Sequence, residues 1–360
     1  MDPTPLYEAQ KRSGAIFSDI AGWAVASSFG DPMGERNVVQ EAVGIADRSH
    51  LGRILAHGSD TLDLLNRLTT NLVDPLPVGK GESTVITTGK GRILDWITML
   101  HHNDDVLLIT SPERREAVSE WIEMYTFDEN TTLEEVTQST AMLSLLGPSA
   151  EGVVETLLGT SVKQLSRLGC MVADWSCHQL IIARTNPSGQ RGFDIIGPAD
   201  VGEALWEAAL GLGASPVGQE ALDALRIEAK LPKWGNELTE EHNPLEAGLE
   251  GEVSWTKGCY TGQEVVARLY NYQRIQRHLV ALELSEDEPI ELNMPLLADG
   301  ETAGYITSVS TLPGDNGVSA LASIRTAYVE LDRVLTIGNA NGANARVTWV
   351  PEFLNEGATS

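Results

Sequence analysis

Short apolar stretches followed by Ser or Pro and then by a helical pattern recur along the first two hundred residues. They read RILAHGSDTLDLLNRL, VLLITSPERREAVSEWIEMY, MLSLLGPSAEGVVETLL and FDIIGPADVGEALWEAAL. A continuous or alternating apolar run is typical of a strand, and apolar residues three or four apart are typical of an amphipathic helix. Ser59 and Ser111 stand where helix N-caps are expected. Strand–helix units separated by further strands predict an α+β fold with helices packed on one face of a sheet.

The pattern changes beyond about Gln276, where β-forming residues alternate or cluster. The stretches are HLVALELS, PLLADGETAGYITSVS, VSALASIR and ANARVTWVPE. Asp299-Gly300 and Asn316-Gly317 are typical hairpin turns. We therefore predict two regions: an α+β region over residues 1–275 and an all-β domain, a barrel, over residues 276–360.

The stretch KGCYTGQEVVAR, residues 257–268, holds one of three cysteines. Thr261 and Glu264 have the spacing of a capping box, which predicts that Thr261 begins a helix. Cys259 would then lie just ahead of a helix N-terminus and close to Lys257, and both features favour a thiolate. The alternative is an inert, partly buried cysteine, and the sequence does not choose between them.

Two acidic residues and one basic residue fall at positions that should be buried. Asp95 lies inside the apolar strand pattern GKGRILDWITM, and Asp194 enters a strand after the glycine-rich turn of RTNPSGQRGFDIIGP. A buried carboxylate must be paired or have a raised pKa, so each is a functional candidate or a member of an internal ion pair. Arg226 shares an apolar helix face with Leu222 and requires a carboxylate partner.

The net charge of −26 disfavours broad binding to nucleic acid, whose phosphates such a surface repels. Against this background, residues 257–278 form a local basic segment in which Glu264 is the only acid. It could hold an anionic ligand tail or the acidic face of a partner, or it could pair with the acidic surface of the chain itself.

The remaining motifs mostly exclude functions. The three cysteines include no CxxC pair, which fits a reducing cytoplasm and argues against an intrinsic metal or iron–sulfur cluster. No run of 18 apolar residues and no apolar leader is present, so we expect a cytoplasmic protein with no membrane partner. P-loop, GxGxxG, HExxH and GxSxG motifs are absent. His101-His102 precedes an Asn-Asp-Asp turn, which favours a hairpin over a metal site.

Several stretches together resemble a known family. In chain order they are GIADRSHLGRILAHGSDTLDLLNRLTTN, GKGRILDWITML, ARTNPSGQRGFDIIGP, DALRIEAKLPKWGNELTEEHNPLEAGL and KGCYTGQEVVAR. This order resembles the folate-binding proteins related to the glycine-cleavage T-protein (the GcvT-like superfamily), over residues 35 to 345 of this chain. The pattern K-G-C-Y-x-G-Q-E is similar to the signature of the YgfZ branch, and T-proteins lack its cysteine.

The resemblance implies two interleaved ferredoxin-like subdomains and a C-terminal β-barrel around a central channel that binds tetrahydrofolate. Asp95 matches an Asp of the T-protein pattern, but Trp96 stands where a second acid is usual. Asp194 matches a pterin-binding acid that is usually Glu, and Pro187 replaces a Tyr seven residues earlier. Arg226 matches the Arg of the RIE stretch. These departures weaken the case for aminomethyl transfer more than the case for folate binding.

The resemblance also implies roles for these residues. Asp194 would accept hydrogen bonds from the pterin, Arg226 or the basic segment would hold the anionic folate tail, and Asp95 would act as proton acceptor or electrostatic stabiliser. Cys259 would act as nucleophile or redox thiol. The branch motif comprises Lys257, Gly258, Cys259, Tyr260, Gly262, Gln263, Glu264 and Arg268.

Three functions follow from this reading. The first is a tetrahydrofolate-binding accessory protein that supports assembly or repair of iron–sulfur enzymes, with iron–sulfur proteins or their assembly factors as partners. It would act on tRNA modification only indirectly, without direct contact to nucleic acid. The alternative is a folate-dependent aminomethyltransferase that works with a lipoyl carrier protein. The third is a folate carrier or sensor without chemistry.

Overall fold

The computed structural model describes residues 1–285, 290–314, 317–339 and 342–351. By its internal contacts the chain forms two compact units. The first contains residues 1–86 and 94–222, and the second contains residues 87–93 and 223–360. Asn316 of the second predicted hairpin turn and the tail 352–360 of the predicted barrel domain lie outside the described residues.

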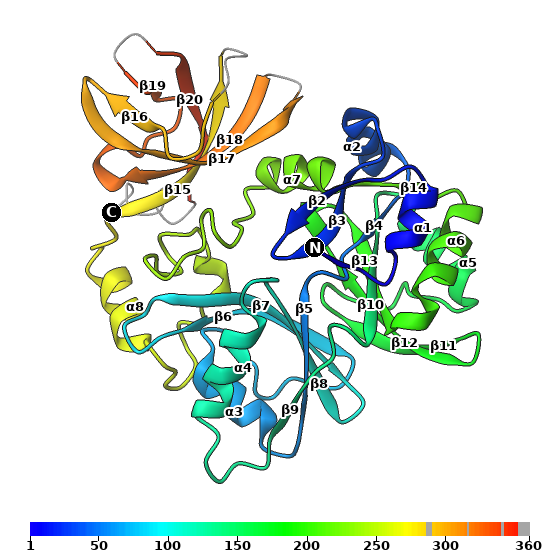
Figure 1. Ribbon diagram of the computed structural model, residues 1–360. Coiled ribbons are helices and arrows are strands. Elements are labelled where there is room, and N and C mark those ends of the chain that lie inside the picture. The colour runs from blue at the N-terminus through cyan, green and yellow to red at the C-terminus, as the bar shows by residue number, and fades with distance from the viewer. Residues whose placement is uncertain (286–289, 315–316, 340–341, 352–360) are drawn as a thin grey trace. The chain divides into compact units, whose positions relative to one another are not determined.

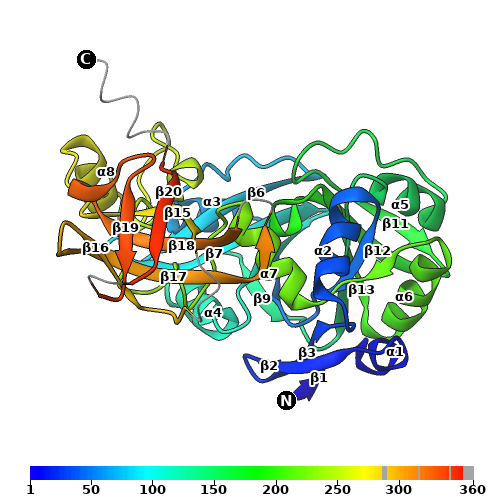
Figure 2. The same ribbon diagram turned by 90° about the horizontal axis from the view of Figure 1, so that it is seen from above.

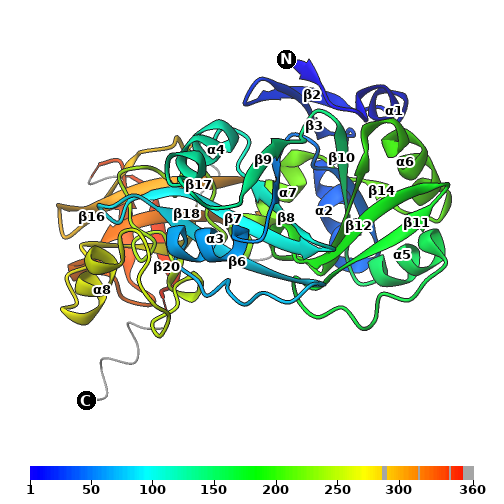
Figure 3. The same cartoon turned by 90° about the horizontal axis from the view of Figure 1, so that it is seen from below.

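The first unit contains a six-stranded sheet with the order β11-β12-β13-β10-β4-β14 (Figure 1). Its strands are β4 (Gly44–Asp47), β10 (Thr140–Leu146), β11 (Cys170–Trp175), β12 (His178–Thr185), β13 (Gly192–Pro198) and β14 (Ser215–Pro216). Helices α5 (Ala150–Leu158) and α6 (Gly202–Gly211) cover one face, as Figure 3 shows. The apolar core beneath them includes Phe193, Ile195 and Trp206. This confirms the helix-on-sheet packing predicted from the recurring pattern.

A second sheet has the order β6-β7-β8-β5-β9. Its strands are β5 (Gly52–His57), β6 (Lys80–Thr87), β7 (Ile93–His102), β8 (Asp105–Thr110) and β9 (Thr132–Glu135). Its helices are α3 (Thr61–Leu68) and α4 (Arg115–Met124). The N-cap residues are Asp60 and Arg114, and neither side chain caps its helix. The prediction that Ser59 and Ser111 cap these helices is therefore wrong. The Ser111 hydroxyl donates a hydrogen bond to Asp95 instead.

The two sheets are interleaved along the chain. After β4 the chain leaves the first sheet, forms β5 to β9, and returns with β10. One apolar cluster joins them, with Leu100 and Leu107 from the second sheet and Met142, Ala183 and Ile196 from the first. We call this cluster the inter-sheet layer. The predicted interleaved α+β architecture is thus confirmed.

Arg53, on β5, links the two sheets from the inside. Its side chain is fully buried, and its guanidinium donates hydrogen bonds to the carbonyl oxygens of Leu51, Ser49 and Thr137. Burial lowers the pKa of Arg53 to about 10. Ser49 and Leu51 belong to the β4–β5 connection and Thr137 to the β9–β10 connection, so Arg53 joins the two places where the chain crosses between the sheets.

The N-terminal residues form a small three-stranded sheet with the order β1-β3-β2, visible beside α1 in Figure 2. The elements are β1 (Asp2–Pro3), α1 (Tyr7–Arg12), β2 (Ile16–Ile20), β3 (Trp23–Ser28) and α2 (Pro32–Glu41). Asp31 caps α2 by accepting a hydrogen bond from the Gly34 amide at 3.0 Å. The sequence pattern predicted no element over these residues.

The second unit ends in a closed barrel with the order β15-β18-β17-β16-β19-β20, drawn in yellow to red in Figure 1. The strands are β15 (Arg277–Leu284), β16 (Pro295–Ala298), β17 (Glu301–Gly314), β18 (Gly317–Arg325), β19 (Val334–Ile337) and β20 (Asn344–Trp349). The predicted barrel is confirmed, and Asp299-Gly300 forms the β16–β17 turn.

Helices α7 (Gln219–Glu228) and α8 (Gln263–Asn271) precede the barrel. Contacts group residues 223–275 with the barrel, so the domain boundary at residue 276 stays a prediction. Among the described residues, no helix is both long enough and apolar enough to cross a membrane.

Candidate functional site

Asp194 is the third residue of β13 and is 5% exposed. It pairs in register with Ser144 on β10 and with Ala183 on β12. The Ser144 hydroxyl donates a hydrogen bond to Asp194 Oδ1. Burial raises the pKa of Asp194, while the charge of Arg48 and the Ser144 hydrogen bond lower it. The strand register therefore places a carboxylate with a shifted pKa at the centre of the sheet, where the sequence predicted it.

The face of the sheet on which Asp194 lies can be read from strand alternation. Side chains two residues apart point to the same face, so Asp194 shares a face with Ile196, as Ser144 does with Met142. Ile196 and Met142 both belong to the inter-sheet layer. Asp194 is therefore a polar group on the side of its sheet that is turned toward the second sheet.

Arg48, which the sequence pattern did not single out, follows β4 directly. Its amide donates to the Met142 carbonyl at 2.8 Å, which fixes its backbone beside β10. Burial lowers the pKa of its guanidinium, and the charges of Asp194 and Asp47 raise it. A cation directly after the strand GIAD is the feature of the sequence that indicates a buried charge at this position.

Asp95 is fully buried on β7. It accepts hydrogen bonds from the Ser111 amide at 2.8 Å, the Ser111 hydroxyl at 2.7 Å and the Trp96 amide at 2.9 Å. Burial raises the pKa of Asp95 to about 7, against these hydrogen bonds and the charge of Arg114. Asp95 is buried as the sequence predicted, and of the two alternatives, pairing with a cation or a raised pKa, it has the raised pKa.

Alternation along β7 separates Asp95 from Trp96. Asp95 shares a face with Ile97 and Met99, which belong to the core packed under α3 and α4. Trp96 shares a face with Leu100 of the inter-sheet layer, and its Nε1 donates to Ser83 Oγ at 2.7 Å. On β7, Trp96 and not Asp95 lies on the face turned toward the sheet that carries Asp194. Contact of Asp95 with a ligand stays a prediction.

Arg226, near the end of α7, lies in an internal polar network of the second unit. Its Nε donates to Asp223 at 2.8 Å, its Nη1 to Glu237 at 3.1 Å and its Nη2 to Ser308 at 2.8 Å. Ser308 Oγ in turn donates to Glu237 Oε1 at 2.6 Å. The predicted carboxylate partner is confirmed. Since each guanidinium nitrogen already has an acceptor, binding of a folate tail by Arg226 stays a prediction.

The branch motif folds as a loop that enters α8. The helix begins at Gln263 after Gly262, whose φ is 86°, and has no side-chain cap. The capping box predicted for Thr261 and Glu264 is therefore wrong. The reason lies in a close approach: a Cβ on Gly262 would lie 2.5 Å from the Thr88 carbonyl oxygen. The Thr87 hydroxyl also donates to the Thr261 carbonyl at 2.6 Å, so this loop is held by tertiary contacts.

The same loop alternates buried and exposed positions. Lys257 and Tyr260 are buried, and Lys257 Nζ lies 5.5 Å from the Tyr260 ring centroid. Burial lowers the pKa of Lys257 to about 8 and raises that of Tyr260 to about 12. Between them, Gly258 and Cys259 are exposed. The loop thus presents the Cys259 thiol to solvent, four residues ahead of the start of α8.

Aromatic and basic side chains follow this motif. Trp255 is 42% exposed and stacks on Tyr270 with ring centroids 4.0 Å apart. Arg268 and Arg274 are exposed, and the Arg277 guanidinium lies 5.2 Å from the Tyr305 ring centroid. The basic segment therefore has cations available to a ligand or a partner.

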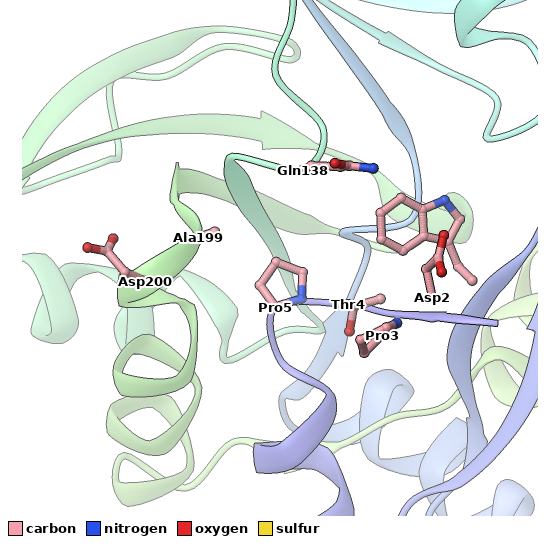
Figure 4. A pocket seen from close by; sticks show the side chains of 8 residues that line it. Asp2, Pro3, Thr4, Pro5, Gln138, Ala199 and Asp200 are labelled. Atoms are coloured by element: carbon pink, nitrogen blue, oxygen red, sulfur yellow. The ribbon is translucent and has the colours of Figure 1, made fainter.

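A pocket of about 500 Å³ opens near the N-terminus (Figure 4). It is lined by Asp2, Pro3, Thr4, Pro5, Trp23, Gln138, Ala199 and Asp200. These residues differ from the predicted site residues. Over the part of the chain that the structure covers, no group of three or more His, Cys, Asp or Glu side chains is arranged to hold a metal ion.

Comparison with known proteins decides the family. The sequence profile described as "GCVT N-terminal domain" matches residues 6–257. The chain belongs to this GCVT family. The structure of the glycine cleavage system aminomethyltransferase T from Bartonella henselae superposes with a TM-score of 0.88 at 23% identity and covers 97% of both chains. The GCVT-like fold predicted from the sequence is thereby confirmed.

Curated relatives within the GCVT family cover nearly the whole chain. An aminomethyltransferase of Symbiobacterium thermophilum is 32% identical over 97% of this chain and 96% of its own. An aminomethyltransferase of Desulfitobacterium hafniense (strain DSM 10664 / DCB-2) is 30% identical over 93% of both chains. Membership of the YgfZ branch, by contrast, stays a prediction that rests on the motif around Cys259.

Proposed function

We propose that this chain binds tetrahydrofolate and catalyses folate-dependent one-carbon transfer of the aminomethyl class. The observation that carries the proposal is the environment of Asp194. This buried carboxylate accepts a hydrogen bond from Ser144, is stabilised by the charge of Arg48, and lies on the face turned to the inter-sheet layer. The names of the GCVT-family relatives, aminomethyltransferases that match along nearly the whole chain, support the reaction class.

The chemistry of Asp194 fits a pterin. A pterin ring presents adjacent N–H donors, and a carboxylate accepts such a pair in bidentate fashion. In its apolar surroundings the hydrogen bonds of Asp194 are stronger than in water. An Asp194 oxygen without a hydrogen-bond donor would be unfavourable there, which favours binding of a ligand that supplies N–H groups. When bound, tetrahydrofolate would supply the reduced nitrogens that accept a one-carbon unit. Asp194 and Ser144 would orient the ring.

A role for Asp95 in proton transfer belongs to the same proposal. A pKa of about 7 suits a general acid or base at neutral pH. Complete burial and three donors from Ser111 and Trp96 instead suit a carboxyl that holds the turn ahead of α4. Replacement of Asp95 by Asn separates the two: loss of turnover with unchanged tetrahydrofolate affinity supports proton transfer, whereas unchanged turnover with reduced stability supports the structural role.

For the anionic folate tail, the exposed cations of the basic segment are the better candidates. Arg268 and Arg274 are exposed, while Arg226 has Asp223, Glu237 and Ser308 as acceptors. An arginine already paired in a buried network would have to exchange those partners for the tail. The exposed cations of the basic segment can accept an anionic group without such an exchange.

Two measurements test the proposal. Tetrahydrofolate titration should give saturable binding to the wild type and a loss of at least about tenfold in affinity for Asp194→Ala, with the exposed Asp174→Ala as matched control. Formation of methylenetetrahydrofolate from an aminomethyl-lipoyl donor should then proceed only with variants that bind. Equal affinity of Asp194→Ala and wild type for tetrahydrofolate would show that Asp194 does not bind the pterin. Binding without turnover would show that the protein is a folate carrier and not an aminomethyltransferase.

A second function is supported by Cys259. We propose that, as in the YgfZ branch, this exposed thiol serves an accessory role toward iron–sulfur enzymes, with those enzymes or their assembly factors as partners and without an intrinsic cluster. The support is the motif loop, in which buried Lys257 and Tyr260 flank an exposed cysteine. The test is the activity of iron–sulfur enzymes under oxidative growth in strains carrying Cys259→Ala or, as control, Cys177→Ala, which also alters an exposed cysteine. Activity lost with Cys259→Ala alone supports the role, and unchanged activity removes it.

A further inference from the structure

Arg48, directly after β4, and Arg184, on β12, differ in whether the guanidinium has a protein partner in the part of the chain that the structure describes. Within residues 1–285, 290–314, 317–339 and 342–351, the half-buried Arg48 side chain forms no hydrogen bond and no ion pair within 4.0 Å. Arg184, on β12 of the same sheet, pairs with Glu151 at 2.5 Å and lies 4.8 Å from the Phe193 ring centroid. A guanidinium has five N–H donors, and removing them from water without acceptors is unfavourable.

Strand register places Arg48 on the same face as Asp194. Ala46 of β4 pairs with Ser144, and Ser144 pairs with Asp194. Arg48 lies two residues beyond Ala46, and its amide continues the pairing with β10 at Met142. Residues two apart on a strand share a face, so Arg48 and Asp194 both project toward the inter-sheet layer.

The neighbouring acid, Asp47, does not neutralise Arg48 by a direct contact. As an adjacent residue it points to the opposite face, where its Oδ2 accepts from the Thr4 hydroxyl at 2.6 Å and its Oδ1 from the Ser49 amide at 2.8 Å. On its own face, Arg48 therefore has Asp194 as its charged neighbour, at a separation longer than an ion pair. A donor group and an acceptor group thus share one face of the sheet without a direct ion pair, and a third group that bonds to both would satisfy them.

We propose that Arg48 and Asp194 together recognise a ring edge on which N–H groups stand next to a carbonyl oxygen. Asp194 accepts from the N–H groups, and Arg48 donates to the carbonyl oxygen. The inference rests on the proposed function and deepens it: the site selects 4-oxopteridines over 4-aminopteridines. A 4-amino group would turn donors toward the Arg48 donors, so the complex would lose a hydrogen bond and leave buried polar groups unpaired.

The experiment measures two affinities by anaerobic calorimetric titration of the full-length protein. The probes are 5,6,7,8-tetrahydrofolate and its 4-amino counterpart, 5,6,7,8-tetrahydroaminopterin. For wild type we expect a preference of at least about thirtyfold for the 4-oxo compound. Arg48→Met should lower tetrahydrofolate affinity by about ten- to hundredfold and change the affinity for the 4-amino compound by less than about threefold. Arg184→Met, the matched control from the other face, should leave the preference unchanged.

The outcomes that would overturn the inference are distinct from failure of the proposed function. If the wild type binds neither probe, the proposed function itself is wrong. If wild type and Arg48→Met bind with the same preference for the 4-oxo compound, Arg48 does not recognise the carbonyl oxygen, and the proposed function still stands. An affinity loss that disappears with tetrahydropteroate, which lacks the glutamate tail, would assign Arg48 to the tail instead. Should Arg48→Met fail to fold in thermal unfolding, Arg48→Lys keeps the charge without the planar fork and should show an intermediate preference.

Discussion

The Ser144 hydroxyl and the Asp194 carboxylate meet across β10 and β13 at a single position of the strand register. The hydrogen bond favours the charged form of Asp194, whereas burial favours the neutral form. Since the ionised carboxylate accepts adjacent N–H donors with both oxygens, the charge of Arg48 and the Ser144 hydrogen bond both widen the pH range over which Asp194 can act.

Replacing Ser144 by Ala should therefore make ligand binding more sensitive to acid. Without the hydroxyl, burial is less opposed and the pKa of Asp194 rises further, so a smaller fraction of Asp194 is ionised at a given pH. We expect tetrahydrofolate affinity to fall by about tenfold at the acidic end of the measured range and to recover partly as the pH rises. Affinity measured from about pH 5.5 to 9 checks this, with the exposed Ser149→Ala as control. A pH profile identical to that of the wild type would show that Ser144 does not tune Asp194.

Asp95 should make stability depend on pH. Its folded pKa of about 7 lies above the ordinary value of 3.8, so its contribution is fully present below about pH 4 and is lost as pH rises through 7. Relative to Asp95→Asn, which does not titrate, the wild type should lose about 1.4 kcal/mol of unfolding free energy per pH unit between about pH 5 and 7. Urea unfolding of both proteins across this range measures the difference. A difference independent of pH would show that Asp95 ionises with an ordinary pKa.

The positions of Asp95, Asp194 and Arg226 in buried elements followed from the sequence, because an apolar run with one ionisable residue has a definite physical meaning. The role of Arg48 and the face of the sheet on which Asp95 lies could not be predicted from the sequence. Both depend on which strands pair and in what register. The cap of α8 was missed for a similar reason. Thr261 and Glu264 satisfy a local rule, but the approach of Thr88 to Gly262 comes from residues far away in the sequence.

Gly262 and Gly258 test that explanation within one motif. A side chain at Gly262 meets both a left-handed backbone, φ 86°, and the Thr88 carbonyl oxygen 2.5 Å from its Cβ. Gly262→Ala should therefore cost roughly 2–4 kcal/mol of stability. A Cβ added at Gly258 would have no other atom within 4 Å, so Gly258→Ala should stay within about 0.5 kcal/mol. Thermal unfolding of the two variants gives the comparison, and equal stabilities would mean that the loop relaxes freely around residue 262.

Arg226 is the residue for which a structural role and a binding role predict opposite results. Glu237 is almost fully buried, with 1% of its side chain exposed, and has Arg226 as an ion-pair partner at 3.1 Å. Removing the guanidinium in Arg226→Met would leave a buried carboxylate without that partner and should cost about 3–5 kcal/mol. Arg346→Met, which breaks exposed ion pairs in the same unit, should cost less than about 1 kcal/mol.

The double variant Arg226→Met/Glu237→Met completes this test. Replacing both members of a buried pair by apolar residues of similar size removes the unpaired charge, so it should regain much of the stability lost in Arg226→Met. Urea unfolding of the single and double variants measures the recovery, and tetrahydrofolate titration of the double variant measures binding. Recovered stability with normal affinity would establish Arg226 as part of the polar network alone. Recovered stability with lost affinity would instead show that the guanidinium exchanges Glu237 for the anionic tail of the ligand.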